Sequence, residues 1–290
     1  MIDREVWALR AVWLVMPFTA GRAFEEALAD TRRLFQQGTS MALWLLWALM
    51  LVVLMVPRAT TLTAVRIVIP AAFAATLWAV VTAEDGGTGE SLLALAVAAV
   101  ASMLALRAPV GDTFVDGSSY GDETRFLLGT PGALLTGPIF AVWAFIVVAA
   151  VAGPLLVLDR EWVFGGIITA FGLPLAALLV PTIHRLSYRW LVFVPAGLVV
   201  HDKTALAQPQ LFRVADIDAL GPAPADTDLA DLSLDSVGLA LRVSLRSQSK
   251  IDRKTGRATS ELTDIEGFVV SPNRPGAVVA HAQTRSYPVG

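Results

Sequence analysis

Residues 111–126 form the densest polar stretch outside the C-terminal third of this 290-residue chain, reading GDTFVDGSSYGDETRF. Its four carboxylates, set among glycines, could bind a divalent cation through oxygen atoms. The stretch lacks the closing bidentate Glu of a twelve-residue calcium loop. It also lacks the Gly-Lys-Ser/Thr of a phosphate-binding loop. We therefore expect an ordered, turn-rich loop in which Arg125 pairs with a carboxylate. The candidate residues are Asp112, Asp116, Tyr120, Asp122 and Arg125.

A second polar region is segregated by charge. Residues 216–235 contain six aspartates and no basic residue, whereas residues 242–257 contain six basic residues against Asp252 alone. Beneath an anionic leaflet, each cation near the surface could contribute about 1 kcal/mol to membrane binding. The alternative, which we favour, is a solvated hairpin or one that pairs with the acidic stretch. The candidate membrane or partner contacts are Arg242, Arg246, Lys250, Arg253, Lys254 and Arg257.

Several kinds of chemistry are disfavoured by composition. The chain has no cysteine, and its three histidines stand far apart, so we predict no metal site. Ser118 and Ser119 lack a nucleophile-elbow context. The net charge of -3 and the lack of an interleaved aromatic platform argue against nucleic acid as a partner. We predict no catalytic residue and no cofactor, and we rank an enzyme using the 111–126 loop third among the hypotheses.

The elements that position these residues are mostly apolar. Hydrophobic residues make up 55% of the chain and charged residues only 16%, below the roughly 25% of soluble proteins. A membrane-spanning helix needs about 17–25 apolar residues. Five segments qualify or come close: residues 41–57, 65–83, 91–107, 133–158 and 162–183. Their interiors carry no ionisable residue, which disfavours a proton-coupled transporter.

Residues 1–40 are predicted to be an amphipathic N-terminal region. Within it, residues 21–38 place Phe24, Leu28 and Thr31 on one helical face, with Gly38 as the expected end. Residues 6–21 are apolar except for Arg10, so they could form a short span or lie on the membrane. The sequence leaves these two alternatives open.

The short loops predict an orientation. Basic residues gather at 58–66, at 107–132 and after residue 183, whereas residues 83–90 contain none and the turn near residue 160 has one. By the positive-inside rule, the C-terminal region is cytoplasmic. Arginine outnumbers lysine nineteen to three, and Ala and Val are abundant, as in proteins from GC-rich bacterial genomes. We therefore expect a multi-pass protein of a bacterial plasma membrane.

The segment WLVFVPAGLVV, residues 190–200, is too short to span and is interrupted by Pro195-Ala196-Gly197. Pro and Gly between two runs of Val, Leu and Phe predict a hairpin, with Gly supplying a positive φ. Further strands are expected at 211–221, at 238–247 and at GFVVS, and a polar loop is expected at 247–261. In 238–247 the alternation places Leu239, Leu241, Val243 and Leu245 on one face.

The order of these strands, followed by FVVSPNRPGAVVAHA as last strand, turn and closing helix, resembles bacterial pleckstrin-homology-like (PH-like) domains on membrane-anchored proteins. The resemblance covers residues 188–284, and its most specific piece is VSPNRP. The spans resemble those of uncharacterised actinobacterial membrane proteins, which implies no function. PH-like domains bind lipid headgroups, peptides or each other, so the resemblance implies recognition without naming a ligand.

The sequence thus predicts an α-helical membrane bundle of about five transmembrane helices (residues 41–183) plus a C-terminal antiparallel β-rich domain with a closing helix. We expect a scaffold or regulatory protein whose cytoplasmic domain binds a protein partner or the membrane surface. Besides the lipid bilayer, its partners would be another protein or further copies of itself. The alternative is a transporter or lipid-handling subunit with an apolar substrate between its helices.

Overall fold

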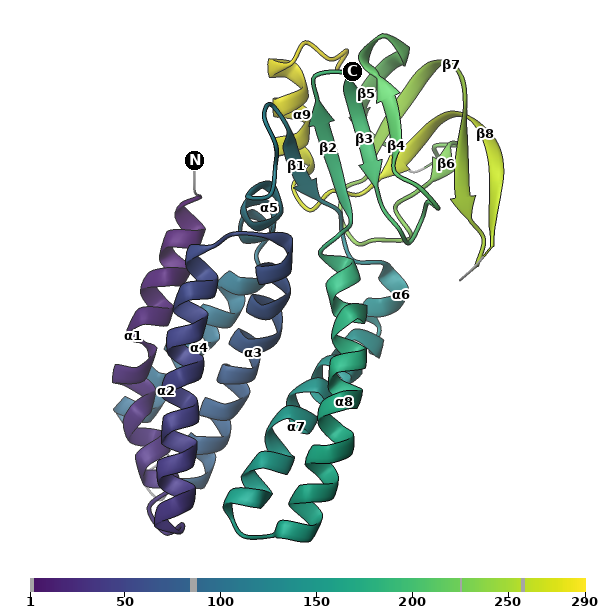
Figure 1. Cartoon of the computed structure of the whole chain (residues 1–290). Coiled ribbons are helices and arrows are strands. Elements are labelled where there is room, and N and C mark those ends of the chain that lie inside the picture. The colour runs from purple at the N-terminus through teal and green to yellow at the C-terminus, as the bar shows by residue number, and fades with distance from the viewer. Residues whose placement is uncertain (1–2, 84–87, 225, 257–258) are drawn as a thin grey trace. The chain divides into compact units, whose positions relative to one another are not determined.

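A computed structural model describes residues 3–83, 88–224, 226–256 and 259–290 (Figure 1). The chain divides into two compact units. We call residues 1–114 and 140–183 the bundle, and residues 115–139 and 184–290 the β-domain. The predicted boundaries, 41–183 and 188–284, left residues 115–139 out of the second unit.

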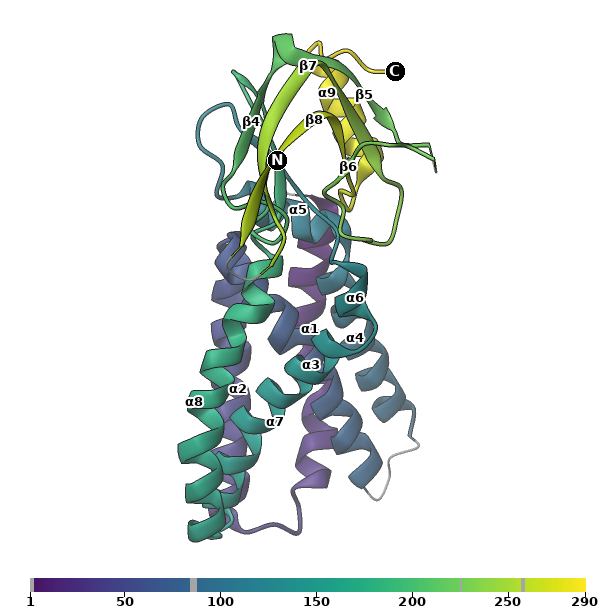
Figure 2. The ribbon, with the colours of Figure 1, turned by 90° about the vertical axis from the view of Figure 1, so that its right-hand side faces the viewer.

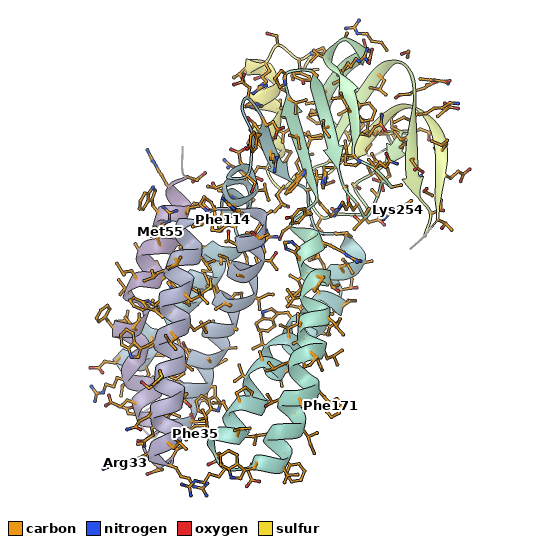
Figure 3. All side chains as sticks on the ribbon, viewed as in Figure 1. Arg33, Phe35, Met55, Phe114, Phe171 and Lys254 are labelled. Atoms are coloured by element: carbon orange, nitrogen blue, oxygen red, sulfur yellow. The ribbon has the colours of Figure 1, made fainter. Side chains whose placement is uncertain are left out.

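Five helices of the described chain are long and apolar enough to cross a membrane, as in a multi-pass membrane protein. Each contains most of one predicted span, and a short helix, α6 (Gly132–Leu135), holds the predicted start of the fourth. The side chains along α2 run from Arg33 at one end to Met55 at the other (Figure 3). The five are α2 (Arg33–Met55), α3 (Ala59–Thr82), α4 (Gly89–Leu106), α7 (Pro138–Leu158) and α8 (Trp162–Leu186).

The N-terminal region differs from its prediction. One helix, α1 (Arg4–Ala27), includes both the apolar stretch and the start of the expected amphipathic helix. Gly38 does not end a helix but lies inside α2, where a Cβ atom would come 2.9 Å from a methyl carbon of Leu158. The predicted amphipathic helix at 21–38 is therefore wrong.

Helix α1 packs against α2, α3 and α4, and its charged residues other than Arg10 stand near its two ends. Glu5 pairs with Arg107 at 3.0 Å, and Arg22 pairs with Glu90 at 2.6 Å. These two ion pairs are seventeen positions apart along α1, which is about 26 Å at 1.5 Å per residue. Between them, most of the α1 surface that faces its neighbours is apolar.

The β-domain contains two four-stranded sheets and a C-terminal helix, α9 (Pro275–Thr284) (Figures 1 and 2). The first sheet has the order β1-β2-β3-β4, and all its pairs are antiparallel. The second has the order β5-β7-β8-β6, with β6 parallel to β8. A single apolar core fills the space between the sheets and α9. The expected β-rich domain with a closing helix is confirmed at this level.

The opening hairpin of the predicted domain is confirmed as β2 (Trp190–Val194) and β3 (Gly197–His201). The role predicted for its glycine is wrong, because Gly197 is not among the positive-φ residues. A Cβ atom at Gly197 would instead lie 2.0 Å from the carbonyl oxygen of Phe212. Glycine is required here by the close approach of β4 (Gln210–Arg213) to the hairpin.

The strand β1 (Thr124–Leu127) was missing from the prediction. It pairs with β2, placing Phe126 opposite Leu191, although α7 and α8 separate the two strands in the sequence. Phe126 and Leu191 are both buried in the β-domain core. The first sheet is therefore completed by a segment that precedes the last two membrane helices.

The second sheet also corrects the expected strands. The predicted run 211–221 is divided by a 3-10 turn, η1 (Val214–Asp216), into β4 and β5 (Ile217–Pro222), which belong to different sheets. The expected polar loop is largely a long hairpin between β7 (Leu241–Lys254) and β8 (Ser260–Val270), clear in Figure 2. Buried Ile251 anchors it, whereas Leu239, expected on the buried face, is 55% exposed and precedes the strand. The small strand β6 is Ala230–Asp231.

Candidate functional site

The polar stretch 111–126 is not one loop. Its first six residues complete helix α5 (Ala108–Asp116), and its last residues form β1. The side chain of Asp112 is buried, close enough to Arg66 of α3 to interact with it electrostatically. Tyr120 is 86% exposed. Asp122 takes part through its backbone, because its carbonyl oxygen accepts a hydrogen bond from Nη2 of Arg285.

Asp116 organises the turn that follows α5. One of its carboxylate oxygens accepts hydrogen bonds from the hydroxyl of Ser119 and the backbone N–H of Arg125, both at 2.9 Å. Arg125 then pairs with Glu123 at 3.0 Å and lies over the ring of Trp190 at 4.9 Å. The predicted pairing of Arg125 is confirmed. The hydrogen bonds of Asp116 hold this turn. Among the described residues, no three potential metal ligands come together.

The basic residues of the second candidate site lie along β7, except Arg257, which lies outside the described residues. Arg246, Lys250 and Arg253 are exposed. Three of the cations also have backbone acceptors. Nε of Arg246 donates to the carbonyl oxygen of Ile217 at 3.2 Å. Nη2 of Arg253 donates to the carbonyl oxygen of Asp231 at 3.4 Å. Nζ of Lys254 donates to the carbonyl oxygen of Lys203 at 2.6 Å. Lys254 stands at the end of β7 (Figure 3).

Strand β8 brings acidic residues to this basic strand. Asp264 stands opposite Lys250, and Glu261 stands opposite Arg253 in the antiparallel register. Arg242 is half-buried, and its Nε has no hydrogen-bond partner among the described residues. The basic stretch is therefore a mixed-charge hairpin, because its neighbours include carboxylates that lie fourteen and eight residues further along the sequence.

A buried ion pair that the sequence did not suggest lies at the base of the first sheet. Nε of Arg189 donates to the Asp202 carboxylate at 2.8 Å, and the two side chains are 1% and 0% exposed. Nη1 of Arg189 also donates to the carbonyl oxygen of Gly129. Asp202 further accepts from the backbone N–H and the hydroxyl of Thr204. Arg189, one of the basic residues after residue 183, ties three segments of the β-domain together.

An aromatic cluster around Phe193 contains two buried polar groups. The imidazole of His281 packs 4.9 Å from the Phe193 ring and 5.7 Å from Phe126, and the Tyr287 ring packs 5.3 Å from Phe193. Neither Nε2 of His281 nor the hydroxyl of Tyr287 has a hydrogen-bond partner among the described residues. A buried polar group without a partner reduces stability.

Burial, and secondly the charge of Arg285, lower the pKa of His281 below its ordinary value of 6.5, while Asp116 acts in the opposite direction. Burial raises the pKa of the Tyr287 hydroxyl, and Arg285 opposes this effect. The polar atoms of this cluster sit against aromatic rings and a cation, with little to stabilise an additional positive charge. The arrangement therefore favours neutral His281.

This cluster predicts how the β-domain responds to acid. The unfolded chain takes up a proton at His281 near pH 6.5, whereas the folded domain does so only at lower pH. Because the unfolded state binds more protons between these two pKa values, the free energy of unfolding should fall as the pH drops from 6.5 through that window. Thermal unfolding of the full chain in mild detergent, followed by near-ultraviolet circular dichroism, measures this dependence.

The matched variant is His281→Phe, which keeps an aromatic ring and removes the titrating group. Its melting temperature should depend less on pH than that of the wild type between pH 7.5 and 5. Parallel pH profiles for the two proteins would contradict the assignment to His281.

No match to this chain was found among protein-family models, curated proteins or solved structures.

Proposed function

We propose that this chain is an integral membrane scaffold or regulatory protein whose β-domain binds a protein partner or the membrane surface. The observation that carries the proposal is the distribution of charge. Among the described residues of the five long apolar helices, only α3 holds an ionisable residue away from its ends, Arg66, whose Nε is shielded from solvent. A proton-coupled transporter is expected to place a series of such groups along its spans. In the β-domain, Arg246, Lys250 and Arg253 are exposed on β7.

The packing of α7 against α8 bears on the transporter or lipid-handling alternative. A Cβ atom at Gly153 would lie 2.5 Å from the hydroxyl oxygen of Thr169, and one at Gly165 would lie 2.6 Å from the backbone nitrogen of Val157. These glycines permit close contact between the helices, as small residues do in membranes. At these positions the helices leave no space for an apolar substrate, which supports a structural role for this pair.

The PH-like assignment belongs to the same proposal. It is supported by two mainly antiparallel sheets, by a core shared between them and by α9 as the closing helix after VSPNRP. A domain of this kind offers strand edges and loops for recognition, and no group of three potential metal ligands is found among the described residues. Binding is therefore the function that this geometry supports best.

We further propose that α1 crosses the membrane as a sixth helix, with both the N-terminus and the β-domain in the cytoplasm of a bacterium. At 24 residues, α1 is about 36 Å long, and its two terminal ion pairs are separated by nearly the thickness of the hydrocarbon core. Arg10 is the charge between them, and its guanidinium donates to the carbonyl oxygen of Leu54 at 2.8 and 3.1 Å.

Cysteine labelling tests this topology cleanly, because the chain has no native cysteine. In bacterial cells freed of the cell wall and any outer membrane but with an intact plasma membrane, a membrane-impermeant maleimide should label Glu161→Cys, in the α7–α8 turn, but not Arg4→Cys. Arg4→Cys should react only after permeabilisation. If both positions react from outside, α1 does not cross; if only Arg4→Cys reacts, the orientation is reversed.

In-cell photo-crosslinking tests the recognition function in the full chain. The chain should not be truncated before the β-domain, because that would leave β1 without β2. A photoreactive amino acid at Leu262 of β8, which is 72% exposed, should give discrete protein or lipid-headgroup adducts. The matched control is Val163 of α8, which is 71% exposed in the bundle. Adducts only at Val163 would move the function into the spans and favour the alternative.

A further inference from the structure

A loop of the β-domain, residues 233–239, exposes two large apolar side chains. Val237 is 79% exposed and Leu239 is 55% exposed, on either side of Gly238. Gly238 has a φ of 124°, a backbone conformation that glycine adopts readily. Neither apolar side chain belongs to the core of the domain, so both are available to contact another surface.

Hydrogen bonds hold this loop against the segment that begins α6. The backbone N–H of Gly132 donates to the carbonyl oxygen of Leu234 at 3.2 Å, and the hydroxyl of Ser236 donates to the carbonyl oxygen of Gly129 at 3.0 Å. The two backbones are so close that a Cβ atom at Gly132 would lie 2.4 Å from the carbonyl oxygen of Asp235. The loop therefore has a defined position beside the start of α6.

The segment that holds the loop continues into a membrane helix. Only Thr136 and Gly137 separate α6 from α7, one of the five helices that are long and apolar enough to span. From Gly132 to Pro138 the chain extends at most about 15 Å, because the residues within α6 rise only about 1.5 Å each. The sequence from Phe126 to Leu158 contains no ionisable residue, so no charge keeps this connection out of the headgroup layer.

A second short connection also keeps the β-domain near the membrane. Three residues separate α8, which ends at Leu186, from β2, which begins at Trp190. Two of the three, Ser187 and Arg189, are buried, so this connection is packed and does not extend freely. The polar headgroup layer is about 5–8 Å thick on each side of the hydrocarbon core. The residues beside α6 are therefore within reach of that layer.

The exposed apolar side chains of the β-domain concentrate at this place. Six large apolar or aromatic side chains are exposed among its described residues, and three of them are Val237, Leu239 and Leu135 of α6. Binding at a membrane interface grows with the apolar area that it buries. The one charged residue of the loop, Asp235, is acidic and exposed, so the loop has no cation to attract an anionic lipid.

We propose that residues 237–239 insert into the interfacial layer of the bilayer, with Val237 and Leu239 buried among the lipid headgroups and the first acyl carbons. The inference rests on the proposed function and names the membrane surface as the partner of this loop. It predicts a contact that needs no anionic lipid, because the contact is apolar.

A fluorescent label on the loop tests the contact in the full chain, which has no native cysteine. Val237→Cys carries an environment-sensitive fluorophore, in phosphatidylcholine nanodiscs that contain a lipid with a nitroxide near the carbonyl end of its acyl chain. The matched control is Ala196→Cys, exposed in the β2–β3 turn at the far end of the hairpin from Trp190. Quenching at position 237 should be at least threefold stronger than at position 196. Equal quenching at the two positions would overturn the inference.

A second substitution tests whether the apolar side chains make the contact. Adding Leu239→Asp to the labelled Val237→Cys protein should lower the quenching at least twofold. Adding Leu211→Asp, at an exposed leucine of β4, should leave it unchanged. Equal effects of the two aspartates would contradict an apolar contact at residue 239.

The lipid composition separates an apolar contact from an electrostatic one. Replacing half of the phosphatidylcholine with phosphatidylglycerol should leave the quenching at position 237 unchanged. Quenching that required phosphatidylglycerol would overturn the inference. A label that is shielded from water but quenched by no nitroxide lipid would also overturn it, because protein would then cover the loop.

Photo-crosslinking at Leu262 distinguishes failure of this inference from failure of the proposed function. If position 237 is not quenched while Leu262 still gives discrete adducts, the loop inference fails and the proposed function stands. If both readouts are negative, the proposed function fails with it.

Discussion

Replacing Asp202 with alanine should destabilise the β-domain by about 3–5 kcal/mol, because it leaves the buried guanidinium of Arg189 without its counter-charge. The substitution also removes the acceptor for the backbone N–H of Thr204, which holds the turn after β3. Hydrogen exchange of the full chain in mild detergent, read by mass spectrometry over β2 and β3, should show opening increased by two to three orders of magnitude.

Two further variants separate the ion pair from general damage. Asp218→Ala removes an exposed carboxylate from β5 and should change the free energy of opening by no more than about 0.5 kcal/mol. Adding Arg189→Met to Asp202→Ala removes the uncompensated charge and should restore part of the lost stability. In that variant the carbonyl oxygen of Gly129 would still accept a hydrogen bond from the hydroxyl of Ser236 at 3.0 Å. If adding Arg189→Met lowered the stability of the Asp202→Ala variant further, this account of the ion pair would be wrong.

The features that could be predicted from the sequence are those with a local signal. A run of about twenty apolar residues indicates a membrane helix without reference to any partner, and most of each predicted span lies within one long helix of the described chain. The hairpin at 190–201 carries its own two apolar runs and turn residues. The closing helix begins at Pro275, where proline is well tolerated in a first helical turn.

The features that were missed depend on partners distant in the sequence. Four residues, 124–127, give too short a signal to indicate a strand until β2 is known to lie beside them. Arg189 follows His184 and Arg185, so the sequence suggests a membrane flank, and only the fold brings it to Asp202. The same holds for the basic stretch on β7, whose carboxylate neighbours are set by the register with β8.

The contact between α1 and α2 also depends on residues that are distant in the sequence. Pro17 lies inside α1 and has no N–H to donate to the carbonyl oxygen of Trp13, four residues earlier. The indole N–H of Trp47 in α2 donates to that oxygen at 2.9 Å, and the indole of Trp13 donates in return to the carbonyl oxygen of Trp47 at 3.1 Å. A neighbouring helix thus satisfies the group that the proline frees, as helices in lipid require.

Trp47→Phe should therefore destabilise the bundle by about 1–3 kcal/mol, because it keeps an aromatic ring but leaves the Trp13 carbonyl oxygen unpaired. Unfolding of the full chain by titration with sodium dodecyl sulfate, followed by circular dichroism, measures this free energy. Trp78→Phe is the matched control, because Trp78 is 48% exposed on α3. It should change the free energy of unfolding by less than about 0.5 kcal/mol.

A double-mutant cycle with Pro17→Ala assigns the loss to this hydrogen bond. Alanine at position 17 restores a backbone N–H that can donate to Trp13, so Trp47→Phe should cost about 1 kcal/mol less in that background. The coupling arises because Trp47 replaces a donor that proline removed. If Trp47→Phe cost the same in both backgrounds, the indole would contribute through packing alone, and the carbonyl oxygen of Trp13 would not need it.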